Sequence, residues 1–199
     1  MFTTDAVVLF LQSHSDKAHI LHTYTRAHGR VNYKVYGIGR RNAIGLYHPF
    51  NLIQITTSTP FNEQTGAFPT LRTACLSHVP QTLSTDPYKK TIALFLSEII
   101  YHTLLHPMPD ENMFEYLRQA ILLLDSEGNQ PDFHLEFLIG FASQLGFGID
   151  EHTHPHLICK PDTRSQRQQQ LRELCKYFSE HIDNWQLPRS LDILMDVFD

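Results

Sequence analysis

Over the first 76 residues, apolar and polar positions alternate in short stretches, a pattern typical of β-strands. The clearest example is residues 30–36, where Val31, Tyr33 and Val35 share one side and polar residues occupy the other. Four more segments are rich in β-branched and apolar residues and are bounded by turn-forming residues. The pattern predicts five strands in a small barrel or sandwich, at residues 3–12, 18–26, 30–36, 46–57 and 68–76.

Beyond residue 80, apolar positions recur every three to four residues, as in amphipathic helices. Asp86 followed by Pro87 predicts a helix start, because aspartate caps free N–H groups and proline suits the first turn. Gly146 predicts a helix end. Helices are expected at about residues 87–104, 110–125, 132–145, 164–182 and 188–198, with irregular structure at 150–163. We therefore expect an α+β multidomain protein, with an OB-fold β-barrel at residues 1–79 and an all-α domain at 80–199.

The composition, 42% hydrophobic and 19% charged residues, is typical of a globular protein. No apolar run approaches the roughly 18–20 residues of a membrane span, and the N-terminus lacks a secretory signal pattern. Three cysteines, Cys75, Cys159 and Cys175, are odd in number and widely spaced, which argues against a disulfide framework. A reduced, cytoplasmic setting is expected.

The charge is distributed unevenly along the chain. Residues 1–75 have a net charge of +4, whereas residues 76–199 have a net charge of −9. The sequence pI of about 6.2 hides this difference. Such asymmetry indicates that the first part faces a polyanion.

Basic and aromatic residues fall on one face of the second and third predicted strands. Because successive side chains of a strand point to opposite faces, Arg30, Lys34 and Tyr36 are expected on the polar face of the strand at residues 30–36. OB-fold barrels bind single-stranded nucleic acid with such faces, since cations neutralise phosphates and aromatic rings stack on bases. The same alternation is also expected of a solvent-exposed strand face that contains tyrosines but binds no ligand. A nucleic-acid-binding face and a plain solvated face therefore both stay open as interpretations. The candidate DNA-binding residues, including the glycine-rich turn at 37–41, are Arg26, Arg30, Lys34, Arg40, Arg41, Tyr24 and Tyr36.

The histidine-rich string at residues 152–159 is the most metal-like motif. His154, His156 and Cys159 belong to residue types that bind zinc. However, the string lacks the C-x-x-C or helical i, i+4 spacing that fixes a tetrahedral site, so a solvated loop is favoured and no metal or cofactor is expected. There is no G-x-S-x-G motif, and residues 37–41 lack the lysine of a phosphate loop. We expect a protein without enzymatic activity.

Six segments, taken in order, resemble the RecO family of bacterial DNA repair proteins. The barrel part matches in the long strand–turn–strand region and in the strand containing Pro-Phe, and the helical part matches in four helices. The likeness spans nearly the whole chain in the right order. The segments are AVVLFLQSHSDKAHILHTYTRAHGRVNYKVYGIGRR, LYHPFNLIQI, ALFLSEIIYHTLL, ENMFEYLRQAILLLD, FLIGFASQLGF and PRSLDILMDVF.

This resemblance implies a recombination mediator that is cytoplasmic and associated with the nucleoid during repair. Such a protein binds single- and double-stranded DNA, promotes strand annealing and works with the RecR protein. It also contacts the acidic C-terminal tail of single-stranded-DNA-binding protein and helps to load RecA. The resemblance assigns DNA contact to the barrel residues named above.

The chain departs from the family pattern after the LGF segment. Many family members have a four-cysteine zinc module there, whereas this chain has Gly146-Phe147-Gly148 and the histidine-rich string. We therefore expect the zinc module to be absent. Two alternatives remain open for function: an OB-fold adaptor that binds RNA or protein, and a metal-dependent hydrolase that uses the histidine-rich loop.

Overall fold

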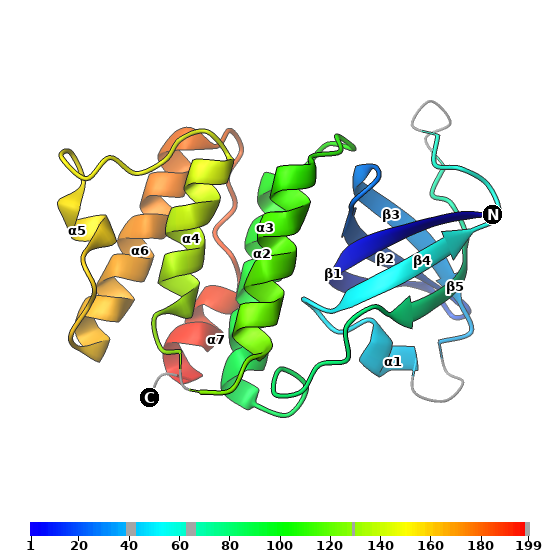
Figure 1. The fold of residues 1–199 in the computed structure, drawn as a ribbon, viewed down its shortest axis with the longest axis horizontal. Coiled ribbons are helices and arrows are strands. Elements are labelled where there is room, and N and C mark those ends of the chain that lie inside the picture. The colour runs from blue at the N-terminus through cyan, green and yellow to red at the C-terminus, as the bar shows by residue number, and fades with distance from the viewer. Residues whose placement is uncertain (39–42, 63–66, 129, 198–199) are drawn as a thin grey trace.

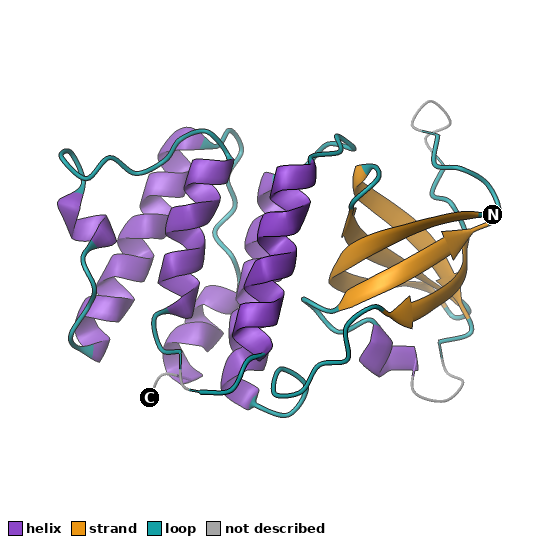
Figure 2. Ribbon diagram, in the orientation of Figure 1, coloured by secondary structure: helices purple, strands orange, loops and turns teal. Residues whose placement is uncertain are grey.

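The computed structural model describes residues 1–38, 43–62, 67–128 and 130–197 of the 199-residue chain. A five-stranded barrel lies at one end of the long axis, and a layered group of helices extends toward the other (Figures 1 and 2). Among the described helices, none combines the length and apolar character that crossing a membrane requires. The elements are β1 (Phe2–Ser15), β2 (Ala18–Thr25), β3 (Gly29–Tyr36), α1 (Ala43–Leu46), β4 (Leu52–Thr57), β5 (Leu71–Leu76), α2 (Pro87–Thr103), α3 (Glu111–Asp125), α4 (Phe133–Gln144), α5 (Pro155–Ile158), α6 (Arg164–His181) and α7 (Ser190–Val197).

The strands are ordered β3-β2-β1-β4-β5, and each neighbouring pair is antiparallel. A parallel bridge between Lys34 and Thr70 joins the two outer strands, and the Lys34 N–H donates to the Pro69 carbonyl at 2.9 Å. This closure leaves a barrel interior filled by apolar side chains, among them Val31, Tyr33 and Ile53. The predicted fold class, an OB-type barrel followed by helices, is confirmed.

One predicted strand begins too early. Residues 46–51 were expected to continue into the strand at 52–57, but they form the end of α1 and a turn. Proline has no N–H for a sheet ladder, and Phe50 adopts a left-handed φ of 69° directly after Pro49. The turn buries the Phe50 ring completely. A second difference is α5, a single helical turn within the segment expected to be irregular.

The helix starts follow from capping. Asp86 accepts the N–H groups of Tyr88 and Lys89 at 2.8 and 3.4 Å, as predicted. Asp110 caps α3 in the same way through Met113. In α6, Thr163 and Gln166 form a reciprocal capping box. These caps fix where each helix begins and therefore which face it turns to the core.

The barrel and the helices share one continuous core. Val7 and Leu9 of β1 and Phe50 before β4 belong to the same apolar cluster as the inner face of α2. The barrel therefore has two buried sides: an interior, and an outer face that packs on α2.

Asp125 at the end of α3 fixes the segment that connects the two parts. Its carboxylate accepts the N–H groups of Gln81, Thr82 and Leu83 at distances of 2.7–3.0 Å, and His78 Nε2 lies 2.7 Å away. Burial alone would raise the pKa of Asp125, but these hydrogen bonds outweigh it and lower the pKa. The connection between barrel and helices is thus held by a buried carboxylate.

Candidate nucleic-acid interface

Strand β3 shows the alternation that the sequence predicts. Val31, Tyr33 and Val35 are buried in the barrel interior, whereas Lys34 is half-buried and Tyr36 is 57% exposed. The outer face of β3 therefore contains the predicted basic and aromatic residues. What covers that face differs from one end of the strand to the other.

At the end near α2, Arg30 is packed against the helix. Its Nη1 donates to the Tyr101 carbonyl at 2.9 Å and approaches the Leu104 carbonyl at 3.5 Å. The guanidinium also lies 3.8 Å from the centre of the Tyr101 ring, in cation–π geometry. Burial lowers the pKa of Arg30, and Tyr101 partly offsets this. Arg30 thus satisfies carbonyl groups at the C-terminal end of α2.

His22 belongs to the same packed region. Its ring stacks on Phe10 with centroids 4.2 Å apart, and Nε2 lies 3.1 Å from Gln12 Oε1. Nδ1 lies 3.5 Å from an Arg30 nitrogen. Burial, together with the positive charge of Arg30, lowers the pKa of His22 to about 4. His22 is therefore neutral at physiological pH, as a partner of a buried arginine requires.

Arg26 is also directed toward the helices. It forms ion pairs with Glu111 and Glu115 of α3, and its guanidinium lies 4.6 Å from the centre of the Phe114 ring. Asp5 is 4.0 Å away on the barrel side. The positive charge of Arg26 is thus compensated by carboxylates of the same chain.

Tyr24, Arg26 and Arg30 therefore pack toward the helices and do not share one open face with Lys34 and Tyr36, and their contact with DNA stays a prediction. Tyr24 is only 2% exposed and belongs to the core shared with α2. The physical reason is that strand alternation defines a face but does not show whether another element covers it. Contact of Tyr24 with DNA would require the junction with α2 to open, and Arg26 and Arg30 would have to exchange contacts with the helices.

At the other end of β3, the outer face is accessible. The parallel bridge from Lys34 to Thr70 brings the start of β5, and with it Arg72, close to the end of β3 that contains Tyr36. Arg72 and Tyr36 are exposed. Tyr36 also pairs with Ala18, so exposed Lys17 lies next to it in the β1–β2 turn. We call Lys17, Lys34, Tyr36 and Arg72 the seam surface, since they flank the line where the barrel closes.

Reasoning from the sequence missed Lys17 and Arg72 as members of this surface. The signal that could have found them is the closure of an OB-type barrel, which brings its third and fifth strands together. The predicted residues Arg40 and Arg41 lie outside the described residues.

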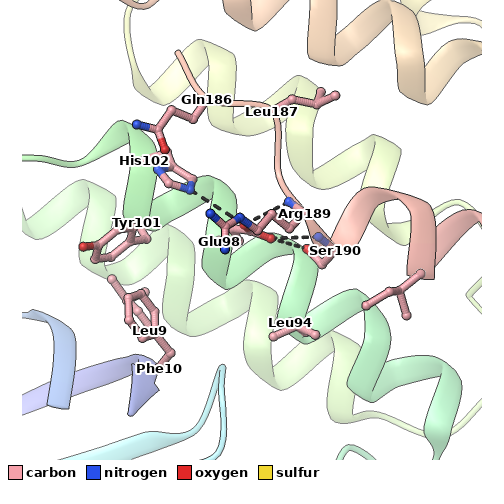
Figure 3. Close-up of a pocket in the computed structure, with 11 residues that line it drawn as sticks. Leu9, Phe10, Leu94, Glu98, Tyr101, His102, Gln186, Leu187, Arg189 and Ser190 are labelled. Carbon is pink, nitrogen blue, oxygen red and sulfur yellow. Dashed lines mark hydrogen bonds and ion pairs between the residues drawn. The ribbon is translucent and has the colours of Figure 1, made fainter. Parts of the chain in front are cut away.

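A cleft of about 420 Å³ lies where β1, α2 and the start of α7 meet (Figure 3). Glu98 is fixed at its floor, because the Ser190 hydroxyl donates to it at 2.6 Å and the Arg189 and Ser190 N–H groups donate at 2.9 and 3.0 Å. Burial would raise the pKa of Glu98, but these donors lower it. Exposed Leu187 and Ile193 line the walls. We call this the junction cleft.

The histidine-rich string runs into α5 and packs against α6. His154 lies edge-on to Tyr177 with centroids 5.2 Å apart, and His156 is 3.8 Å from Glu173. Cys175 is buried, which raises the pKa of its thiol to about 12. In the ranges that the structure describes, no three histidine, cysteine or acidic side chains are grouped as metal ligands would be. Loss of the zinc module stays a prediction.

The model of the "Recombination protein O C terminal" family matches residues 84–187, just over half of the chain. The chain belongs to the RecO family. It is 26% identical to the DNA repair protein RecO of Flavobacterium johnsoniae, with 98% of each chain aligned. It is 30% identical to the RecO of Porphyromonas gingivalis over 71% of this chain and 59% of that protein, and 23% identical to the RecO of Azobacteroides pseudotrichonymphae over the full length of both. The match to the RecO family model covers α2 to α6, the helices that follow the barrel in the chain.

Proposed function

We propose that this RecO-family chain is a DNA-binding recombination mediator that uses the seam surface to hold a DNA strand during annealing. The observation that supports this role most directly is the register of the barrel closure. It brings Lys34, Tyr36 and Arg72 together on an exposed face, while Arg26 and Arg30 are engaged by the helices. The role is one of binding rather than catalysis.

The chemistry of the seam surface suits a single strand without sequence preference. Lys17, Lys34 and Arg72 would each neutralise a phosphate and release a counterion. Three such contacts give a slope of about −2 for log K against log salt on single strands. Stacking of a base on Tyr36 would add about 1–3 kcal/mol.

A charge-reversal pair tests this proposal. We expect Lys34→Glu with Arg72→Glu to weaken binding of a labelled single-stranded oligonucleotide by about tenfold or more at low salt, and to reduce the salt slope by about 1.4. Fluorescence anisotropy over a salt series measures both quantities.

The matched control is Lys90→Glu with Lys160→Glu, which changes the net charge equally on the helical part. Its affinity should stay close to that of the unmodified protein. Equal loss in the two double variants would show that total charge, not the seam surface, determines binding. Arg30→Glu is unsuitable for this purpose, because it would bury a carboxylate against the carbonyls of α2.

We infer that the partners are those the family resemblance implies: RecR, RecA, and the acidic C-terminal tail of single-stranded-DNA-binding protein. The junction cleft supports a tail contact, since its apolar walls are joined by exposed Arg189. A synthetic tail peptide should bind, and Arg189→Glu should weaken that binding at least fivefold by calorimetry. Unchanged peptide affinity in this variant would exclude the junction cleft as the tail site.

The alternative of an RNA- or protein-binding adaptor can be tested with the same assay. An RNA strand of identical sequence should bind no more tightly than DNA if the seam surface reads phosphates and base faces alone. A clear preference for RNA would favour the adaptor.

A further inference from the structure

A second groove, of about 460 Å³, lies between α6 and α7 in the helical part. Its floor is apolar and includes Cys175, Leu191 and Met195. Trp185 lines it from the segment before α7. In Figure 1, α6 lies toward the end of the long axis opposite to the barrel, so this groove is separate from the seam surface.

Two cations stand at the rim of the groove. Arg172 and Lys176 are one helical turn apart on α6, and both are exposed. Lys176 lies 3.8 Å from Glu180, but this pair is at the surface, with 78% of the lysine side chain exposed. Such a pair contributes little and is easily exchanged for another anion. Within the described ranges, Arg172 forms no ion pair.

The tryptophan adds an aromatic surface to this cationic rim. The Trp185 ring packs on Phe178 with centroids 5.6 Å apart, which fixes the ring from inside, and it is only partly buried. An indole held in this way is a platform on which a base can stack.

One acidic residue, Asp192, lines the opposite wall. The carboxylate of Asp192 weakens the attraction of the groove for anions on the α7 side. The groove therefore suits a ligand whose negative charge lies near Arg172 and Lys176 on α6 and whose apolar part contacts the floor. A nucleotide has this division between phosphate and base. Double-stranded DNA keeps its base faces stacked inside the helix, so a single strand fits better.

We propose that the groove between α6 and α7 is a second single-strand site, with a base against Trp185 and the phosphates at Arg172 and Lys176. The inference rests on the proposed function for its ligand class, but it concerns a different surface. One molecule would then hold single strands at two separated places, as the annealing of two strands requires.

Trp185 is the only tryptophan of the chain, so its fluorescence reports on this groove. Titration with unlabelled oligothymidine should quench the emission. We expect Arg172→Glu with Lys176→Glu to weaken the quenching titration about tenfold or more, and Asp192→Asn to strengthen it two- to fivefold. The control Glu127→Gln removes an equal charge from the α3–α4 loop and should change nothing.

The seam variant Lys34→Glu with Arg72→Glu separates the two proposals. If oligothymidine still quenches the Trp185 emission of this variant, the groove binds a single strand independently of the seam surface. A loss of oligonucleotide binding in the anisotropy assay, with the quenching retained, is then assigned to the seam surface. Absence of quenching by oligothymidine in the unmodified protein, or quenching that only an acidic peptide produces, would overturn the inference. If the double charge reversal unfolds the protein, Arg172→Gln with circular dichroism as a folding check replaces it.

Discussion

Replacing Arg30 by methionine should destabilise the fold without weakening DNA binding. Methionine keeps the aliphatic length of the side chain but removes the guanidinium from the end of α2. The change deletes a charge-assisted hydrogen bond to the Tyr101 carbonyl at 2.9 Å and the contact with the Tyr101 ring. Arg30 would thus be shown to join barrel and helices rather than to bind a strand.

The magnitude follows from the contacts. A hydrogen bond to a charged group contributes about 1.5–3 kcal/mol, and a desolvated cation–π contact about 2 kcal/mol. The contact with the Leu104 carbonyl, at 3.5 Å, adds little. Against this gain stands the cost of burying the guanidinium, several kcal/mol, which the variant no longer has. The net loss in free energy of unfolding should be about 1–2 kcal/mol, equivalent to a melting temperature lower by about 3–6 °C.

Urea unfolding followed by circular dichroism measures this loss. Lys34→Met, on the accessible end of the same strand, is the matched control and should change the free energy of unfolding by less than about 0.5 kcal/mol. In the DNA-binding assay the effects should be reversed: Lys34→Met should weaken binding, whereas folded Arg30→Met should bind as tightly as the unmodified protein. An Arg30→Met protein of unchanged stability that no longer binds DNA would refute the reasoning.

Three further changes have defined outcomes. Because the pKa of His22 is about 4 when folded and 6.5 in the reference state, protons favour the unfolded chain between these values. Between pH 6.5 and 4 the free energy of unfolding should therefore fall less steeply with acidification in His22→Gln than in the unmodified protein, by up to about 1.4 kcal/mol per pH unit. An unchanged slope would show that His22 does not contribute to the pH dependence. Gly29→Ala should lower the melting temperature by several degrees, because φ is +64° and a Cβ would overlap the Met108 backbone; an unaltered value would contradict that contact. Asp125→Asn should cost about 2 kcal/mol in urea unfolding, since the amide replaces an acceptor of three N–H groups, and a neutral result would show that the linker is held otherwise.

The sequence was sufficient to identify strand β3 and its two faces, because period two is a local property of the chain. It was insufficient to distinguish Lys34 from Arg30, which stand on the same face of the same strand. That difference depends on α2, whose residues are about 70 positions away in the chain. Arg72 was missed for a similar reason, since its position near the end of β3 follows from the bridge between Lys34 and Thr70, which are far apart in the chain.

The helices were predicted well because their caps are local too, as Asp86 and Asp110 show. The turn at Phe50 could not be predicted, since an apolar residue rarely adopts positive φ. It does so here because the ring fills the core between barrel and helices.

The core shared by the two parts limits how the chain can be divided. Cutting the chain after the barrel would uncover Val7, Leu9 and Tyr24, all buried at present, as an apolar patch on an isolated fragment. Such a fragment is expected to aggregate rather than to serve as a minimal DNA-binding module. Calorimetry of the intact protein should accordingly show a single cooperative transition. Insertions that separate the barrel from the helices would expose the apolar side chains of β1 that now pack in the shared core.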